Sequence, residues 1–161
     1  SDFSLNSGKD IVSLEGECRH ITSYLQIQQV RYQDILTYDV DIPEEIANCK
    51  IPKITLQPLV ENALYHGIKN KRGKGRIVVT GRREKDKCVI RVEDNGIGMT
   101  KERLNQVRGG LTTKIEDSND FYGLYNVNER IRLKFGEEYG LSIDSVLQEG
   151  TCVEVWLPWE S

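Results

Sequence analysis

The chain has 161 residues, of which 38% are hydrophobic and 29% charged, and its formal net charge is −3. This length fits one domain with one additional element, and the composition is ordinary for a soluble globular protein. Charges of both signs are mixed along the chain, so a clustered basic face for nucleic acid is missing, and we expect no nucleic-acid partner. The basic stretch from Lys69 to Arg76 is short and interrupted, and we interpret it as a solvated loop.

The cysteines lie far apart and form no CxxC pair, which argues against a zinc site and a disulfide framework. Three of them stand in apolar patterns, where a free cysteine acts as a small hydrophobe. No apolar run has the length of a membrane span, and the first ten residues do not resemble a signal peptide. We expect a cytoplasmic chain with reduced, buried or half-buried thiols at Cys18, Cys49, Cys88 and Cys152.

A long helix is predicted after a loose lead-in over residues 1–12. From Ser13, apolar positions recur at alternating spacings of four and three, with the polar Gln28 among them, which is a heptad seam. The seam either packs on the domain that follows or pairs with another helix, and the pattern does not choose between them. Its positions are Leu14, Cys18, Ile21, Leu25, Gln28, Tyr32 and Ile35.

The next elements alternate between strands and helices. Alternation from Tyr38 to Ile42 predicts a strand that Pro43 stops, and a short helical piece follows over Glu44–Cys49. A second helix has apolar residues at 56, 59, 60, 63 and 64 and ends at Gly67. Because Pro58 lacks an N–H, this helix either begins close to Pro58 or kinks there.

The remaining pattern predicts four more strands and two more helices. Consecutive strands joined by short turns indicate an α+β fold, a two-layer α/β sandwich whose mixed, mostly antiparallel sheet has helices on one face. Thr100 is positioned to cap a short helix, and residues 108–122 form a polar loop without periodicity. The predicted strands are Arg76–Arg82, Lys87–Glu93, Leu141–Leu147 and Thr151–Leu157, and the predicted helices run from Thr100 to Val107 and from Leu124 to Gly136.

Four polar or glycine-bearing motifs are candidates for chemistry. In DNGIGM, residues 94–99, the glycines let backbone approach a ligand closely, and the Asp94 carboxylate can accept a hydrogen bond from a ligand amine. Asn62 and His66 lie on the polar side of the second helix, Gly123 leaves helix N–H groups free for an anion, and Gly150-Thr151 opens the last strand. Taken singly, these are equally an ordinary turn, solvated helix residues, a helix start and a hairpin.

In this order the motifs resemble the GHKL ATP-binding family, whose members share the Bergerat fold and include histidine kinases, type II topoisomerase ATPases and chaperone ATPases. The stretch LQPLVENA at 56–63 followed by His66-Gly67, and the stretch GLYNVNER at 123–130, look like the LytS/YesM branch of sensor histidine kinases. The helix with YLQIQ at 24–28 and Arg31 is similar to the segment that precedes the nucleotide domain in that branch. The resemblance covers roughly residues 11–158.

This resemblance implies an ATP-dependent protein histidine kinase with ATP and Mg²⁺ as ligands. Asp94 would accept a hydrogen bond from the adenine amino group, with Thr151 helping through water. Asn62 would coordinate Mg²⁺ that bridges the phosphates, and His66 would contact the base or ribose. The remaining implied site residues are Gly96 and Gly98 closing over the base, Met99 packing near it, Gly123 and Leu124 facing the phosphates, and Glu61 as a candidate general base. Residues 100–122 would form a lid over ATP.

The reaction implied is transfer of the γ-phosphate to a histidine outside this chain, and then to the receiver domain of a response regulator. The branch carries that histidine in a PHFxxN-type segment, which this sequence lacks, and we interpret His20 as a structural residue. Residues 1–37 are therefore expected to be a remnant of the dimerisation and phosphoacceptor region, and residues 38–161 the ATP-binding catalytic domain. The full-length protein is expected to be a homodimer anchored in the cell membrane.

Two departures from the family pattern keep other functions open. Phe121 occupies the first glycine position of the second glycine motif, and Tyr65 stands where relatives often have a lysine. Both keep open the alternative of a kinase-like interaction module that acts through protein contacts. A GHKL ATPase of the chaperone or repair class is the other alternative, and Glu61 does not stand where the hydrolytic glutamate of that class does.

Overall fold

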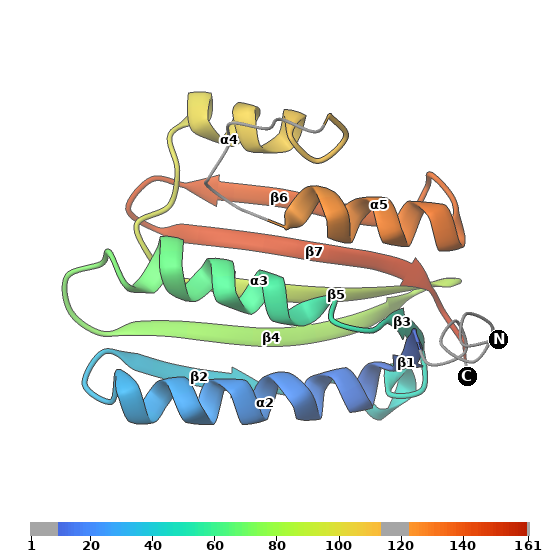
Figure 1. Ribbon diagram of the computed structural model, residues 1–161, viewed down its shortest axis with the longest axis horizontal. Helices are drawn as coiled ribbons and strands as arrows, with labels where there is room; N and C mark the ends of the chain where they lie inside the picture. The colour runs from blue at the N-terminus through green and yellow to red at the C-terminus, as the bar shows by residue number, and fades with distance from the viewer. Residues whose placement is uncertain (1–9, 114–122, 161) are drawn as a thin grey trace, which may run out of the picture.

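The computed structural model describes residues 10–113 and 123–160, and its centre is a five-stranded sheet in the order β2-β4-β5-β7-β6. Strands β2 and β4 are parallel, and every other neighbouring pair is antiparallel. Figure 1 shows helices α2, α3 and α5 lying over one face of this sheet. The predicted two-layer sandwich with a mixed, mostly antiparallel sheet is therefore confirmed. The strands are β2 (Leu36–Val40), β4 (Gly75–Glu84), β5 (Lys87–Asp94), β6 (Gly140–Val146) and β7 (Gly150–Pro158).

Helix α2 (Leu14–Arg31) packs its predicted seam against the sheet and α3. It begins at Ser13, whose Oγ accepts a hydrogen bond from the Gly16 N–H at 3.1 Å. The seam residues from Leu14 to Leu25 are buried in the same core as the strands, so the seam packs on the domain that follows it. The last two predicted seam positions lie beyond the end of the helix. The division of the chain at residue 37 remains a prediction.

A second, two-stranded sheet was missed by the sequence patterns. Strand β1 (Ile11–Ser13) pairs antiparallel with β3 (Lys50–Pro52), so the prediction of a loose lead-in as far as residue 12 was wrong. Three-residue strands are too short to show an alternating pattern, and their pairing joins segments far apart in the chain. The predicted helical piece after Pro43 is a single 3₁₀ turn, η1 (Glu44–Ile46).

Helix α3 (Leu56–Asn62) continues as a π-helical segment, η2 (Ala63–Ile68). Pro58 stands in the first turn of α3, where a missing N–H costs little, so the helix begins close to Pro58 as one alternative predicted. The π-helical winding is visible in the hydrogen bond from Lys69 N to Leu64 O, at 2.8 Å, which spans five residues. A π-helix has i→i+5 hydrogen bonds where an α-helix has i→i+4 bonds. The segment extends to Ile68, one residue past the predicted end at Gly67.

The two helices predicted to begin after Thr100 and at Leu124 are present as α4 (Lys101–Gly109) and α5 (Leu124–Phe135). The Thr100 Oγ1 accepts a hydrogen bond from Arg103 N at 3.1 Å, and α5 lies between Gly123 and Gly136, both with positive φ. Because α4 runs to Gly109, it includes the first two residues of the predicted loop 108–122. The greater part of that loop, residues 114–122, lies outside the described residues, and so does Phe121.

The apolar core lies between the sheet and the helices. All four cysteines are free, with Cys152 half-buried and the other three buried, as predicted. Burial, helped by the nearby Glu17 charge, raises the pKa of the Cys18 thiol to about 12. Within the described part of the chain, no helix is both long enough and apolar enough to span a membrane.

Candidate functional site

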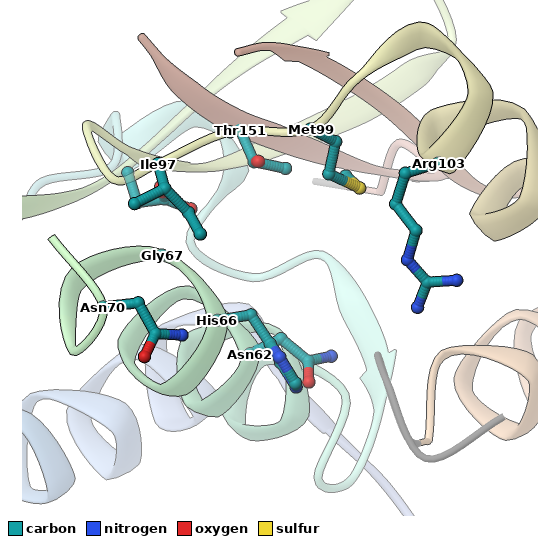
Figure 2. Close-up of a pocket in the computed structure, with 10 residues that line it drawn as sticks. Asn62, His66, Gly67, Asn70, Ile97, Met99, Arg103 and Thr151 are labelled. Atoms are coloured by element: carbon teal, nitrogen blue, oxygen red, sulfur yellow. The ribbon is translucent and has the colours of Figure 1, made fainter. Parts of the chain in front are cut away.

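A cavity lies where the end of α3 and η2 meet the loop after β5, the start of α4 and the start of β7 (Figure 2). Six of the predicted site residues line it together, although they come from three separate segments. These six are Asn62, His66, Asp94, Gly98, Met99 and Thr151, and the four lining residues that were not predicted are Gly67, Asn70, Ile97 and Arg103. The motifs singled out in the sequence therefore converge on one place.

Asp94 ends strand β5 and lies opposite Thr151 of β7 in the sheet register. Its Oδ1 accepts a hydrogen bond from the Gly96 N–H at 2.9 Å. Burial raises the pKa of the Asp94 carboxyl from 3.8 to about 6, while hydrogen bonds from the Gly96 and Thr151 backbones and the charge of Lys71 act to lower it. The carboxylate is therefore partly desolvated, and it can accept a hydrogen bond from a donor that enters the cavity.

The glycines of the 94–99 loop allow three segments of backbone to meet. A Cβ on Gly96 would overlap the backbone of Gly67, and a Cβ on Gly98 would overlap the carbonyl of Val146. Gly98 also has a φ of 66°, which side chains rarely adopt. The sequence explained Gly96 and Gly98 by a close approach to a ligand, and the structure adds that the protein's own backbone requires them. Gly67 was interpreted as a helix end, and its contact with Gly96 and Asp94 was missed.

Asn62 is only 8% exposed, so the alternative of a solvated helix residue is wrong. Its Nδ2 is buried without a hydrogen-bond partner in the part of the chain that the structure describes. A buried amide group without a partner is costly, and a ligand atom in the cavity would supply one. Rotation of the amide by 180° exchanges nitrogen and oxygen at this point, so Asn62 can present either a donor or an acceptor to the cavity.

Thr151 presents its hydroxyl oxygen as an acceptor. Ser145 Oγ donates to the Gly150 carbonyl at 2.9 Å and lies 2.8 Å from Thr151 Oγ1. Because the Ser145 hydroxyl has one proton and uses it on that carbonyl, Thr151 is the donor in the second bond. The lone pairs of Thr151 Oγ1 are then left for a ligand or a water, and the buried Met99 adds an apolar wall beside it.

Arg103, on the first turn of α4, is the only lysine or arginine that lines the cavity among the described residues. Its Nη1 donates to Gln106 Oε1 at 3.1 Å. Figure 2 shows its guanidinium reaching from α4 toward the Asn62 and His66 side chains on the opposite wall. Helical periodicity alone did not single out this residue, because nothing local indicates that this face of α4 meets a cavity.

The other predicted site residues are not among those that line the cavity. The charge of Glu61 adds to the effect of burial in raising the pKa of Tyr24, on α2, to about 12. Gly123 has a φ of 92° at the start of α5 and faces Pro58, and Leu124 is buried. The site roles predicted for Glu61, Gly96, Gly123 and Leu124 stay predictions.

Two further residues that the sequence singled out also lie apart from the cavity lining. Tyr65 has the Lys69 ammonium 5.3 Å from its ring centroid. His20 Nε2 lies 2.6 Å from Gln57 Oε1 on an exposed part of α2, in a contact that ties α2 to α3.

Comparison with known proteins identifies a family and several relatives that this chain resembles. Residues 52–161 match the family described as histidine kinase-, DNA gyrase B-, and HSP90-like ATPase. The chain is 36% identical over 156 residues to the sensor histidine kinase YesM of Bacillus subtilis (strain 168), covering 96% of this chain and 25% of YesM. It is 35% identical over 150 residues to the sensor protein LytS of Staphylococcus saprophyticus, covering 93% of this chain and 25% of LytS.

Among solved structures, the catalytic domain of histidine kinase ThkA in a nucleotide-free form matches with a TM-score of 0.69 at 11% identity. That match covers 92% of this chain and 96% of the ThkA chain, and it shows a shared fold. The chain therefore belongs to the histidine kinase-, DNA gyrase B- and HSP90-like ATPase family, which confirms the resemblance seen in the motifs. It spans about a quarter of the length of the sensor kinases it matches.

Proposed function

We propose that this chain is the ATP-binding catalytic part of a sensor histidine kinase. It binds ATP in the cavity and positions the γ-phosphate for transfer to a histidine outside this chain. The observation that carries the proposal is the pair of buried polar side chains in one cavity, the Asp94 carboxylate and the unpartnered amide of Asn62. Membership of an ATPase family and the names of the relatives support it.

The adenine base is proposed to bind at the strand ends. Asp94 accepts a hydrogen bond from the adenine amino group, and Thr151 Oγ1 accepts one from a water that also contacts the base. Met99 and Ile97 supply apolar surface for the ring, and His66 contacts the base or ribose from the opposite wall. A carboxylate and a hydroxyl oxygen used only as acceptors would favour a base that presents an amino group, which guanine does not do at the same position.

The phosphate chain is proposed to extend toward Asn62 and Arg103. The guanidinium matches the negative charge of the phosphates, and the N-terminus of α5 at Gly123 offers backbone N–H groups to an anion. No group of three or more histidine, cysteine or acidic side chains in the described residues would hold a metal by itself. Mg²⁺ usually takes one or two protein ligands plus substrate phosphates and water, and the buried Asn62 amide fits that requirement. When bound, Mg²⁺ would neutralise charge on the phosphates.

The chemistry assigned to this chain is mainly positioning. In the transfer, a bond forms between the γ-phosphorus and an imidazole nitrogen, and the bond to the β–γ bridging oxygen breaks with its electron pair leaving on ADP. The attacking nitrogen uses its lone pair, so the proton that is lost comes from the other ring nitrogen, and Glu61, next to Asn62 on α3, remains the candidate base. Arg103 and Asn62 act by holding the phosphate chain in line, which is where most of the catalysis in phosphoryl transfer arises.

The partners follow from this reaction. ATP and ADP occupy the cavity, the acceptor histidine belongs to a region of the same or a partner chain, and the phosphoryl group then passes to the receiver domain of a response regulator. The names of the relatives as sensor kinases support these partners, and a membrane-anchored homodimer is the proposed full-length form.

Calorimetric titration of the chain with ATP and ADP, with and without Mg²⁺, tests the proposal. We expect ATP binding that strengthens with Mg²⁺ and that Asp94→Asn weakens. Asp86→Asn, an exposed carboxylate at the other end of β5, is the matched control and should bind like the wild type. A folded chain that binds no ATP would reject the proposal and favour the interaction module, whereas rapid ATP hydrolysis by the chain alone would favour a GHKL ATPase.

A further inference from the structure

The turn Lys53–Thr55 leads from β3 into α3, the helix that carries Asn62, and two distant side chains hold its backbone. Ile54 in this turn has a φ of 60°, a left-handed conformation that a branched side chain seldom adopts. Such a conformation persists only where surrounding contacts fix it, and the hydrogen bonds of the turn identify those contacts.

Glu17 of α2 holds the N–H side of the turn. This carboxylate is 3% exposed, and its Oε1 accepts from Ile54 N at 2.9 Å. Its Oε2 accepts from Thr55 N and Leu56 N, both at 3.1 Å. These amides belong to the start of α3, where N–H groups have no partner within the helix and a negative charge is favourable.

Glu17 therefore acts as the cap of a helix other than its own. Thr55 precedes α3 and is the residue type expected to cap it, yet its Oγ1 donates to the Pro52 carbonyl at 2.6 Å and makes no cap bond. The acceptor that α3 requires is supplied from α2, which ties the position of α3 to that of α2.

Arg130 of α5 holds the carbonyl side of the same turn. Its Nη1 donates to Lys53 O at 2.8 Å, and its Nη2 donates to Ile54 O at 2.7 Å. This fork fixes two successive carbonyls with one rigid group, which a lysine cannot do. Arg130 stands two turns after Gly123, so the turn also links the start of α3 to the helix proposed to face the phosphates.

We propose that Glu17 and Arg130 are positioning residues for the phosphate end of the ATP site. By fixing the turn Lys53–Thr55 from two sides, they set where α3 begins, and so set Asn62 relative to α5. A displacement of α2 is then transmitted through Glu17 to Asn62. This inference rests on the proposed function. It predicts that loss of either residue weakens binding of the phosphates and leaves binding of the base unchanged.

The test compares ATP and adenosine binding by Glu17→Gln, Arg130→Gln and Arg130→Lys, at a temperature where circular dichroism shows each variant fully folded. Glu17→Gln keeps the shape but replaces one acceptor oxygen with a donor, and Arg130→Gln removes the fork. Leu25→Ala, in the buried seam of α2, is the control that lowers stability without touching the turn. If Glu17→Gln does not fold, the two Arg130 variants carry the test, because that side chain is more exposed.

We expect ATP affinity to fall about tenfold in Glu17→Gln and Arg130→Gln, the loss typical of one hydrogen bond to a charged group. Adenosine affinity should be unchanged, Arg130→Lys should recover part of the ATP affinity, and Leu25→Ala should bind both ligands like the wild type. ATP affinity equal to that of the wild type, or an equal loss of adenosine affinity, would overturn the inference alone. Absence of ATP binding in the wild type would overturn the proposed function and this inference with it.

Discussion

Replacing Asp94 with asparagine should make the protein more stable while weakening its binding of ATP. The folded state raises the pKa of this carboxyl from 3.8 to about 6, chiefly through burial. A carboxyl whose folded pKa is raised destabilises the folded state when it is ionised, by about 3 kcal/mol for a rise of this size. This cost is absent below about pH 4, grows as the pH rises from about 4 to 6, and is constant above that.

Asparagine removes the charge but keeps one acceptor oxygen. Asp94 accepts hydrogen bonds from the backbones of Gly96 and Thr151, and the loss of one of them costs about 1–1.5 kcal/mol. The net gain at about pH 7.5 is therefore about 1.5–2 kcal/mol, or roughly 3–8 °C in Tm for a chain of this length. At about pH 4 the carboxyl is largely neutral, and the gain should disappear.

Thermal unfolding followed by circular dichroism at both pH values measures the effect on stability, with Asp86→Asn as the control that should show no such pH dependence. Calorimetry measures the effect on binding: an amide NH₂ that faces the adenine amino group should lower ATP affinity by about tenfold to a hundredfold. In the wild type, ATP affinity should fall by about tenfold between pH 7 and pH 5 as the carboxylate is protonated. A variant that is less stable at about pH 7.5, or that binds ATP as tightly as the wild type, would refute this reasoning.

Two other substitutions test further parts of the site, and a third tests the packing of α5. Arg103→Gln should lower ATP affinity by about tenfold and leave adenosine affinity unchanged in calorimetry, because ATP carries the phosphate chain that the guanidinium is proposed to contact and adenosine does not. Gly98→Ala should destabilise the chain by about 2–4 kcal/mol in urea unfolding, because its Cβ would overlap the Val146 carbonyl at a positive φ. Asn128→Ala should cost about 2–4 kcal/mol in the same assay, because its buried amide donates to the Leu111 carbonyl and accepts from Leu141 N–H.

Two of these substitutions, Arg103→Gln and Gly98→Ala, have a matched control in helix α4. Lys101→Gln removes an equal charge from the same turn of α4 without reaching the cavity, and it should bind ATP like the wild type. Gly109→Ala places a methyl group where nothing lies within reach, and it should leave stability nearly unchanged. If Lys101→Gln loses as much ATP affinity as Arg103→Gln, the loss reflects the reduced net charge of α4, and a specific contact between Arg103 and the phosphates is excluded.

Sequence patterns predicted best the elements whose signals are local. Thr100 marked the start of α4, and the two glycines at 123 and 136 marked the two ends of α5, because caps and positive-φ positions act within a few residues. Alternation predicted the five-stranded sheet to within a few residues at each strand end, because one face of every strand must be apolar. Six lining residues of the site were predicted from motif order and family resemblance, without knowledge of the cavity.

The rest was decided by contacts between segments far apart in the chain. The phase of α3 placed Asn62 opposite the apolar stripe of its own helix, but only the packing of the β5 loop and α4 over that face buried the amide. Arg103 is a second case: its side of α4 lines the cavity only because the tertiary structure places Asn62 and His66 on the opposite wall. Glu17 stands in the first turn of α2, yet its carboxylate caps α3, 37 to 39 residues away. A local pattern fixes which side of an element is apolar, whereas only the tertiary structure fixes what the polar side meets.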